Sequence, residues 1–225
     1  MLNQIPGYHV TSNYSLDMMH TILEGIVPVE LLCVLYALCH DSAKSRSLEH
    51  LSERIRIFWG VINVDRCNQP PVLNAIDKPS KLLPSMKAVQ LWSLLKYLPL
   101  IWGDIVDADN KHWEFLLHLS HLVDIIYAPV FTTGMVAYLT DLIAEHLNMF
   151  KNIYSSGDNA VSLKPKHHLL VHLPSVIVQS GPLVDMNTMR YELKNSFFKR
   201  CAHVMSNFRN MSHTDSSASA VCSVF

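Results

Sequence analysis

The chain becomes helical within the stretch Asn13-Tyr14-Ser15-Leu16-Asp17-Met18-Met19-His20-Thr21-Ile22-Leu23-Glu24-Gly25. Residues 8–16 have the one pattern compatible with a strand, and the apolar spacing after Asp17 predicts a helix to about His40. Pro28 is expected to kink this helix or to begin a second helical segment, because proline lacks the amide hydrogen that a helix interior needs. Asp17 therefore stands at a corner between an extended segment and a helix.

Helical periodicity continues from this corner almost to the end of the sequence. Residues 65–83 carry three prolines and are expected to form a loop that serves as an internal hinge. Residues 1–16 are interpreted as a short lead-in, residues 17–210 as one helical domain, and the Ser-rich residues 211–225 as a disordered tail. The sequence thus predicts a mainly α fold, a helical bundle. Its further helices are expected at 47–62, 84–102, 111–127, 132–154, 164–179 and 187–207, with Asn187 capping the last.

The composition is apolar, with 49% hydrophobic and 16% charged residues in 225 and a net charge of -1. This balance predicts exposed apolar surface that a protein partner or self-association would cover. The five cysteines include no CxxC pair, which favours a reduced, intracellular chain. No signal peptide is recognisable, and no stretch is expected to reach the roughly 20 apolar residues of a membrane helix.

Asp17 has two interpretations. Aspartate is a good helix cap, and this role needs no further chemistry. Alternatively, Asp17 could hold a metal ion together with His20, since residues three apart share a helix face. The position of Asp17 in the sequence does not separate these readings.

The segment 186–210 is the most basic part of the chain. It contains five Lys or Arg residues and one acid, Glu192, which leaves a local excess of four positive charges. Such a stretch can contact nucleic-acid phosphates, or it can be a solvated helix face with local ion pairs. The five basic residues are Arg190, Lys194, Lys199, Arg200 and Arg209.

Histidine is frequent, with 13 residues. His168 and His172 have the i,i+4 spacing of a metal-ligand pair on a helix. The segment that contains His118, His121 and Asp124 offers a second arrangement of ligand types at one-turn spacing. A small metallohydrolase is therefore an alternative reading, although no third ligand is fixed by spacing and no Gly-rich phosphate loop or nucleophile motif is present.

Several blocks of sequence, spread in order over roughly residues 12–210, form a set of motifs. The first block is Asp17, Met19, His20, Glu24, Gly25, Pro28, Glu30 and Leu31, in a D-x-M-H-x-x-x-E-G-x-x-P-x-E-L pattern. The middle blocks are 90–92 with 98–104, and 163–174, followed by Gly181-Pro182-Leu183. The last block, M-R-[FY]-E-x-K-H-x-F-F-K, is matched by Met189, Arg190, Tyr191, Glu192, Lys194, Phe197, Phe198 and Lys199. Together these blocks resemble animal transposase-derived proteins of the CACTA-like (CMC) DDE superfamily.

This resemblance implies an ancestral function in DNA cleavage and strand transfer in the nucleus. Asp17 would be the second catalytic Asp and Glu192 the catalytic Glu, with Mg²⁺ or Mn²⁺ as cofactor and His20 as a further candidate ligand. The helices between them would correspond to the all-α insertion and last helix of an RNase H-like domain. The basic helix would contact DNA.

Two departures from the family pattern limit the expected activity. Asn195 replaces the histidine that usually follows the Lys of the last motif. The first catalytic Asp of such proteins lies on a strand upstream, and only 16 residues precede Asp17. We therefore expect a transposase-derived chain whose core sheet is mostly missing and which is inactive alone. The alternative is a helical protein-interaction module without nucleic-acid chemistry.

Overall fold

The fold was analysed in a computed structural model, which describes Pro6 and residues 16–40, 47–62, 66–73, 86–157 and 159–205. These residues form eight α-helices with short π and 3-10 segments, and no strand occurs among them. The predicted mainly α class is thereby confirmed. The chain divides into two compact units, Met1–Met186 and Asn187–Phe225, and each is described by itself. Residues 8–15 of the strand predicted at 8–16 and the tail from 211 lie outside the described residues, and Leu16 is not in a strand.

The first unit begins with a π-helix, η2 (Met19–Ile26), which leads directly into α1 (Val27–His40). Pro28 lies in the first turn of α1, where its missing N–H costs little, so the expected second segment does begin there. Helix α1 forms the centre of the core and buries a long run of apolar side chains. Five of these are completely buried, namely Val27, Leu31, Val34, Leu35 and Leu38.

The continuous segment Met19–His40 corrects one expectation from the sequence. Its 22 residues are long and apolar enough to cross a membrane by length and composition, although no such stretch was expected. In the fold, 61% of the most apolar 18 residues of this segment is buried in the first unit. The high hydropathy of this segment therefore matches its position as a central core helix.

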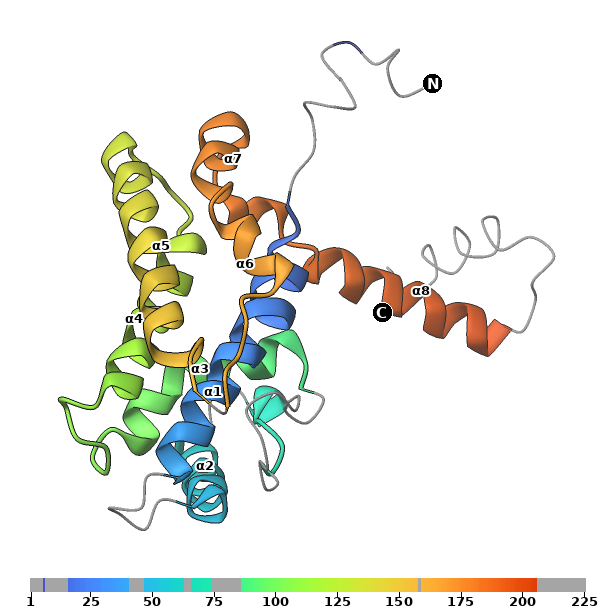
Figure 1. Ribbon diagram of the computed structural model, residues 1–225. Coiled ribbons are helices and arrows are strands. Elements are labelled where there is room, and N and C mark those ends of the chain that lie inside the picture. The colour runs from blue at the N-terminus through green and yellow to red at the C-terminus, as the bar shows by residue number, and fades with distance from the viewer. Residues whose placement is uncertain are drawn as a thin grey trace. The chain divides into compact units, whose positions relative to one another are not determined.

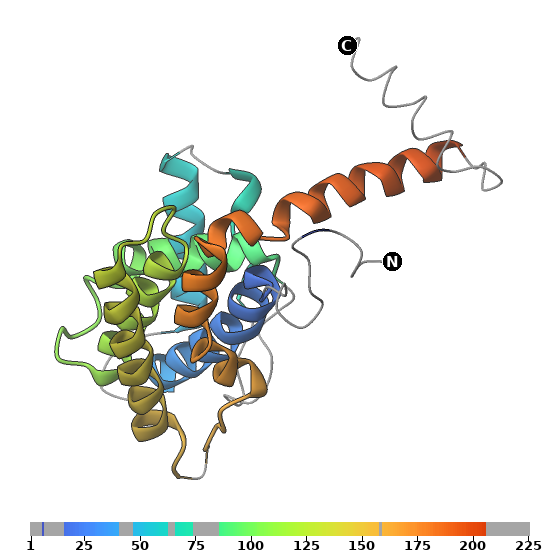
Figure 2. The same ribbon diagram turned by 90° about the horizontal axis from the view of Figure 1, so that it is seen from above.

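The other helices of the first unit surround this central segment (Figures 1 and 2). Helix α4 packs along α5 and also against α1, whereas η2 packs against α3 and α6. Helix α2 rests on α3, and α7 rests on α5. The bounds of these helices are α2 (Leu48–Ile62), α3 (Ala88–Trp102), α4 (Lys111–Ile126), α5 (Thr133–Tyr154), α6 (Pro165–Leu170) and α7 (Leu173–Ser180).

The helix predicted at 164–179 is divided into α6 and α7. Pro174 has no N–H to donate to the carbonyl four residues earlier, so the helical ladder is interrupted. The intervening turn is held by bonds from Val171 N–H to His168 O (3.2 Å) and from His172 N–H to Leu169 O (3.1 Å). This break changes the direction of the chain just after the histidine-rich segment.

The described part of the predicted loop at 65–83 is fastened to neighbouring helices. It begins with η3 (Arg66–Asn68), and Leu73 N–H donates to Ser52 Oγ on α2 (3.1 Å). Gln90 Nε2 on α3 donates to Gln69 O (3.0 Å). Residues 66–73 are thus anchored to two helices, while the hinge role remains a prediction because residues 74–83 lie outside the described part.

The second unit contains α8 (Met189–Met205). The predicted cap is present at the start of α8, because Met189 N–H donates a hydrogen bond to Asn187 Oδ1 (3.2 Å). Phe197 and Phe198 make an edge contact with ring centroids 5.7 Å apart. Arg209 lies outside the described residues.

Candidate functional site

Asp17 occupies the N-terminal end of η2, where its two carboxylate oxygens have different partners. Oδ1 accepts the backbone N–H of Met19 (3.1 Å), which is a helix-capping contact. Oδ2 contacts Nδ1 of His20. Asp17 thus caps the helix, as the first reading predicts, and also contacts the histidine one turn on, while metal binding by Asp17 and His20 stays a prediction.

His20 links Asp17 to a second acid and to α6. Its Nε2 lies 3.6 Å from Oε2 of Glu24, so its ring stands between two carboxylates. Lys166 Nζ, on α6, donates to His20 O at 2.6 Å. The lysine crosses directly over Gly25, where an added Cβ would lie 2.3 Å from Lys166 Cδ. Glycine at position 25 thus leaves room for the lysine that joins α6 to η2.

This acidic cluster does not by itself fit a two-ion site. Mg²⁺ and Mn²⁺ prefer oxygen ligands, and paired ions need carboxylates that bridge them. One oxygen of Asp17 is used by a backbone N–H and the other by His20. No group of three or more His, Cys, Asp or Glu side chains that could hold a metal ion occurs in the described part of the chain. Glu192 lies in the second unit, so its convergence with Asp17 stays a prediction.

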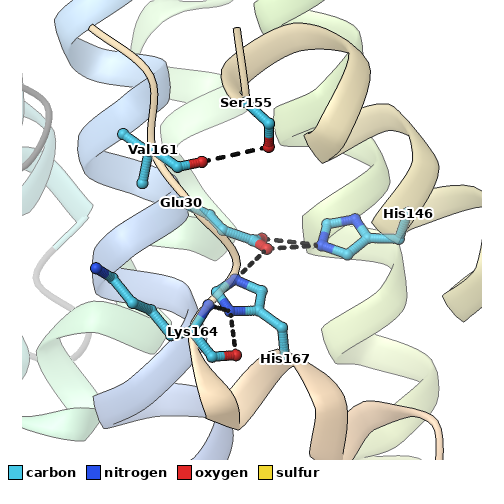
Figure 3. Close-up of polar contacts among 6 residues, drawn as sticks. All are labelled: Glu30, His146, Ser155, Val161, Lys164 and His167. Atoms are coloured by element: carbon cyan, nitrogen blue, oxygen red, sulfur yellow. Dashed lines mark hydrogen bonds and ion pairs between the residues drawn. The ribbon is translucent and has the colours of Figure 1, made fainter.

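The buried polar centre of the first unit is a different set of residues: Glu30, His146 and His167. The Glu30 carboxylate lies between the two imidazole rings (Figure 3). His146 Nε2 lies 3.0 and 2.9 Å from its two oxygens, and His167 Nε2 lies 3.2 Å from Oε1. The exposed fractions are 0% for Glu30 and His146 and 1% for His167. These contacts join α1, α5 and α6 inside the core.

Hydrogen bonds around His167 indicate its tautomer. Lys164 N–H donates to Nδ1 of His167 (2.9 Å), so this nitrogen acts as an acceptor. The ring proton is then on Nε2, which faces the carboxylate of Glu30. Ser155 Oγ donates to Val161 O (3.3 Å) and helps to hold the connection between α5 and α6 (Figure 3).

Burial and the histidines have opposite effects on Glu30. Burial raises the pKa of this carboxyl group, but the charge and hydrogen bond of His146, together with those of His167, outweigh burial and hold the pKa below its ordinary value. Burial also raises the pKa of the nearby Cys33 thiol to about 12, with the charge of Glu30 adding to the effect. Glu30 is therefore a buried carboxylate, and Cys33 stays a protonated thiol rather than a nucleophile.

Aromatic rings enclose this buried centre. The Phe115 ring stacks on His146 with centroids 4.9 Å apart, and Phe150 lies against His167 at 5.2 Å. The His118 ring also stacks on His146, with ring centroids 5.4 Å apart. Burial and the charge of His146 lower the pKa of His118, although Glu145 opposes them. The arrangement can tie helices together but offers no opening to a substrate.

His118 and His121, which the sequence offers as metal ligands on one helix face, do not point to a common ion position. His118 Nε2 lies 3.5 Å from Glu145 Oε2, whereas His121 Nε2 bonds the hydroxyl of Tyr138 (2.9 Å). The two rings thus face different residues of α5. These contacts do not support the metallohydrolase reading at this position.

Helix α8 carries four of the five predicted DNA-contacting residues, all except Arg209. Lys194, Lys199 and Arg200 are exposed, as is Glu192. Lys199 lies on the face of Glu192, seven residues earlier, whereas Lys194 and Lys199, five residues apart, lie on different sides of the helix. The positive charges are therefore distributed around the helix rather than gathered in one stripe.

Sequence reasoning missed the buried cluster of Glu30, His146 and His167. A single signal was available, because Glu30 is the one acid inside the apolar run of residues 26–38. A carboxylate in such a run is expected to be paired when buried. Neither histidine could be identified as its partner from spacing, since they lie 116 and 137 residues away in the sequence.

No protein-family model matches the chain, and neither the curated proteins nor the solved structures contain a significant match.

Proposed function

We propose that this chain is a transposase-derived helical domain that binds nucleic acid through the backbone phosphates and does not cleave DNA alone. The proposal rests first on the order of the motifs, which begins at Asp17 and ends at Lys199. The RNase H-like ancestry and a nuclear location are part of the same proposal. The observation that carries the binding function is the charge of α8.

The charge of α8 contrasts with that of the whole chain. The helix Met189–Met205 contains four basic residues and one acid, a net charge of +3, whereas the whole chain has a net charge of -1. The rest of the chain therefore carries -4. Positive charge on an exposed helix is the usual source of sequence-independent affinity for nucleic acids. The basic charge sits on a compact unit distinct from the acidic remainder.

A second candidate function is protein binding, which an apolar groove between α5 and α7 favours. One part of this groove has a volume of about 660 Å³ and includes Val130 and Val178 in its lining. These valines are 67% and 74% exposed. Exposed apolar side chains around a hollow are typical of protein-binding surfaces. This alternative predicts binding that depends little on salt.

The proposal is tested by the affinity of the full chain for a fluorescent DNA duplex at several salt concentrations. We expect the logarithm of the association constant to fall linearly with the logarithm of salt concentration. The double variant Lys199→Ala/Arg200→Ala should weaken binding to all sequences about equally. Its salt slope should be smaller by about two, since each phosphate contact contributes about 0.9.

A matched control replaces two exposed lysines of the first unit, Lys111→Ala/Lys151→Ala. This control removes the same number of charges but leaves α8 intact, so its salt slope should equal that of the wild type. Equal losses in the two double variants would show that net charge, rather than α8, governs binding. The absence of measurable affinity for the duplex at low salt would favour the protein-binding alternative, and salt-independent binding would show that the DNA is not held through its phosphates.

A further inference from the structure

His168 and His172 direct their Nε2 atoms toward one another across the break between α6 and α7. These two atoms lie 3.2 Å apart, and the ring planes are inclined by 86°. Both residues are exposed, while Leu170, between them, and Leu173, directly after His172, are buried with exposed fractions of 1% and 0%. The backbone that carries the two rings is therefore anchored in the core, although the rings face solvent.

The backbone of the pair is held at both ends. Val171 N–H donates to His168 O (3.2 Å), and Val176 N–H donates to His172 O (3.1 Å). Ser175 Oγ also donates to His172 O, at 2.9 Å. These bonds restrain the turn before any ligand arrives, so little conformational entropy is lost when both rings bind the same ion.

The distances are those of two nitrogens that share one ion. Zinc–imidazole bonds are about 2.0–2.1 Å, so nitrogens 3.2 Å apart subtend about 100° at a common ion, near the tetrahedral angle. Rings that converge in this way have centroids about 5 Å apart, whereas a straight N–H···N bond would separate them by about 5.5 Å. The observed separation of the centroids is 4.9 Å. The lone pairs thus converge on a point beside the line that joins the two nitrogens.

We propose that His168 and His172 form a two-ligand site for a divalent transition-metal ion of the zinc, nickel and copper class. Neutral imidazole suits these ions, whereas Mg²⁺ and Mn²⁺ prefer carboxylate oxygens. The site is therefore chemically distinct from the acidic residues of the ancestral active site. Since no three-ligand group occurs in the ranges that the structure describes, the pair supplies two of the ligands of such an ion.

The test is a titration of the full chain with Cu²⁺, which binds nitrogen ligands most tightly of the divalent first-row ions. Electron paramagnetic resonance should show hyperfine splitting from two imidazole nitrogens in the wild type. Either single substitution, His168→Ala or His172→Ala, should reduce the affinity by about tenfold or more, because each removes an intramolecular second ligand. The double variant should lose little more than either single variant.

Two exposed histidines elsewhere in the first unit provide matched controls, His50→Ala and His121→Ala. Both should keep the wild-type affinity and spectrum, and far-UV circular dichroism checks that every variant is folded. Wild-type binding in both His168→Ala and His172→Ala would overturn the proposal. Loss of the two-nitrogen spectrum in a control variant would also overturn it, since the ion would then be held by other histidines.

Discussion

Replacement of Glu30 tests whether the buried polar centre stabilises the first unit. Glu30→Ala removes the carboxylate that faces two buried imidazole rings, and leaves both His146 and His167 without their acceptor. Breaking a buried ionic contact by removing one partner costs about 3–5 kcal/mol. Glu30→Gln should cost less, about 1–3 kcal/mol, because the amide oxygen can still accept from one ring while its NH₂ group faces the other.

The free energy of unfolding is measured by urea denaturation, with tryptophan fluorescence as the signal. This signal reports on the first unit, because Trp59, Trp102 and Trp113 are buried in it. Glu114→Ala is the matched control, since this exposed glutamate also lies in the first turn of a helix. It should change the free energy of unfolding by less than about 1 kcal/mol.

A double-mutant cycle separates the interaction from the loss of volume. Glu30→Leu and His146→Leu should each be strongly destabilising, because each leaves one buried polar partner alone. The combined variant should be less destabilised than the sum of the single variants by about 0.5–3 kcal/mol. If Glu30→Ala differs from Glu114→Ala by less than about 1 kcal/mol, or if the two leucine substitutions are additive, the buried contact does not stabilise the fold.

Three further predictions concern the pH dependence of stability, the space around Gly25 and DNA cleavage. The pKa of Glu30 is held below its ordinary value, so its stabilising contribution is present above about pH 4.3 and is lost as pH falls through the folded-state pKa. Urea midpoints measured from pH 7 to pH 3 should therefore fall more steeply in the wild type than in Glu30→Gln. Gly25→Ala should lower the free energy of unfolding by about 1–2 kcal/mol, because its Cβ would lie 2.8 Å from His20 O and would displace Lys166. Gly60→Ala, in open space, should instead raise the free energy of unfolding by about 0.5–1 kcal/mol. A rise in stability in both glycine variants would show that the close approach at position 25 is readily relaxed. The isolated chain should leave supercoiled plasmid uncut in Mg²⁺ or Mn²⁺, and nicking that disappears in Asp17→Ala would show that Asp17 and Glu192 form a working site.

Local signals in the sequence predicted most helices well. The helices expected at 111–127 and 132–154 are found at Lys111–Ile126 and Thr133–Tyr154. Both begin at strong caps, since Asn110 Oδ1 accepts from Trp113 N–H and Thr132 Oγ1 accepts from Met135 N–H. Caps and apolar periodicity act over a few residues and can therefore be read from one sequence.

Features that depend on distant contacts were not predictable in this way. His167 and His168 are adjacent and chemically identical, yet one is 1% exposed and faces Glu30 while the other is exposed and faces His172. Their roles depend on how α6 is rotated against α1, which follows from packing rather than from local propensity. The same is true of Glu24 and Glu30, of which one lies near the surface beside His20 and the other is buried.

Helix α6 places three successive side chains in three different surroundings. Lys166 reaches His20 O on η2, His167 contacts the buried Glu30, and His168 faces His172. A helix of six residues has little stability of its own, so the position of α6 depends on these contacts. The contact between His167 and Glu30 is the most deeply buried of the three. Loosening it would therefore also disturb the bond from Lys166 to His20 O and the exposed histidine pair. Glu30 belongs neither to the cluster around His20 nor to the pair of His168 and His172. It affects both, because α6, which it holds through His167, carries Lys166 and His168.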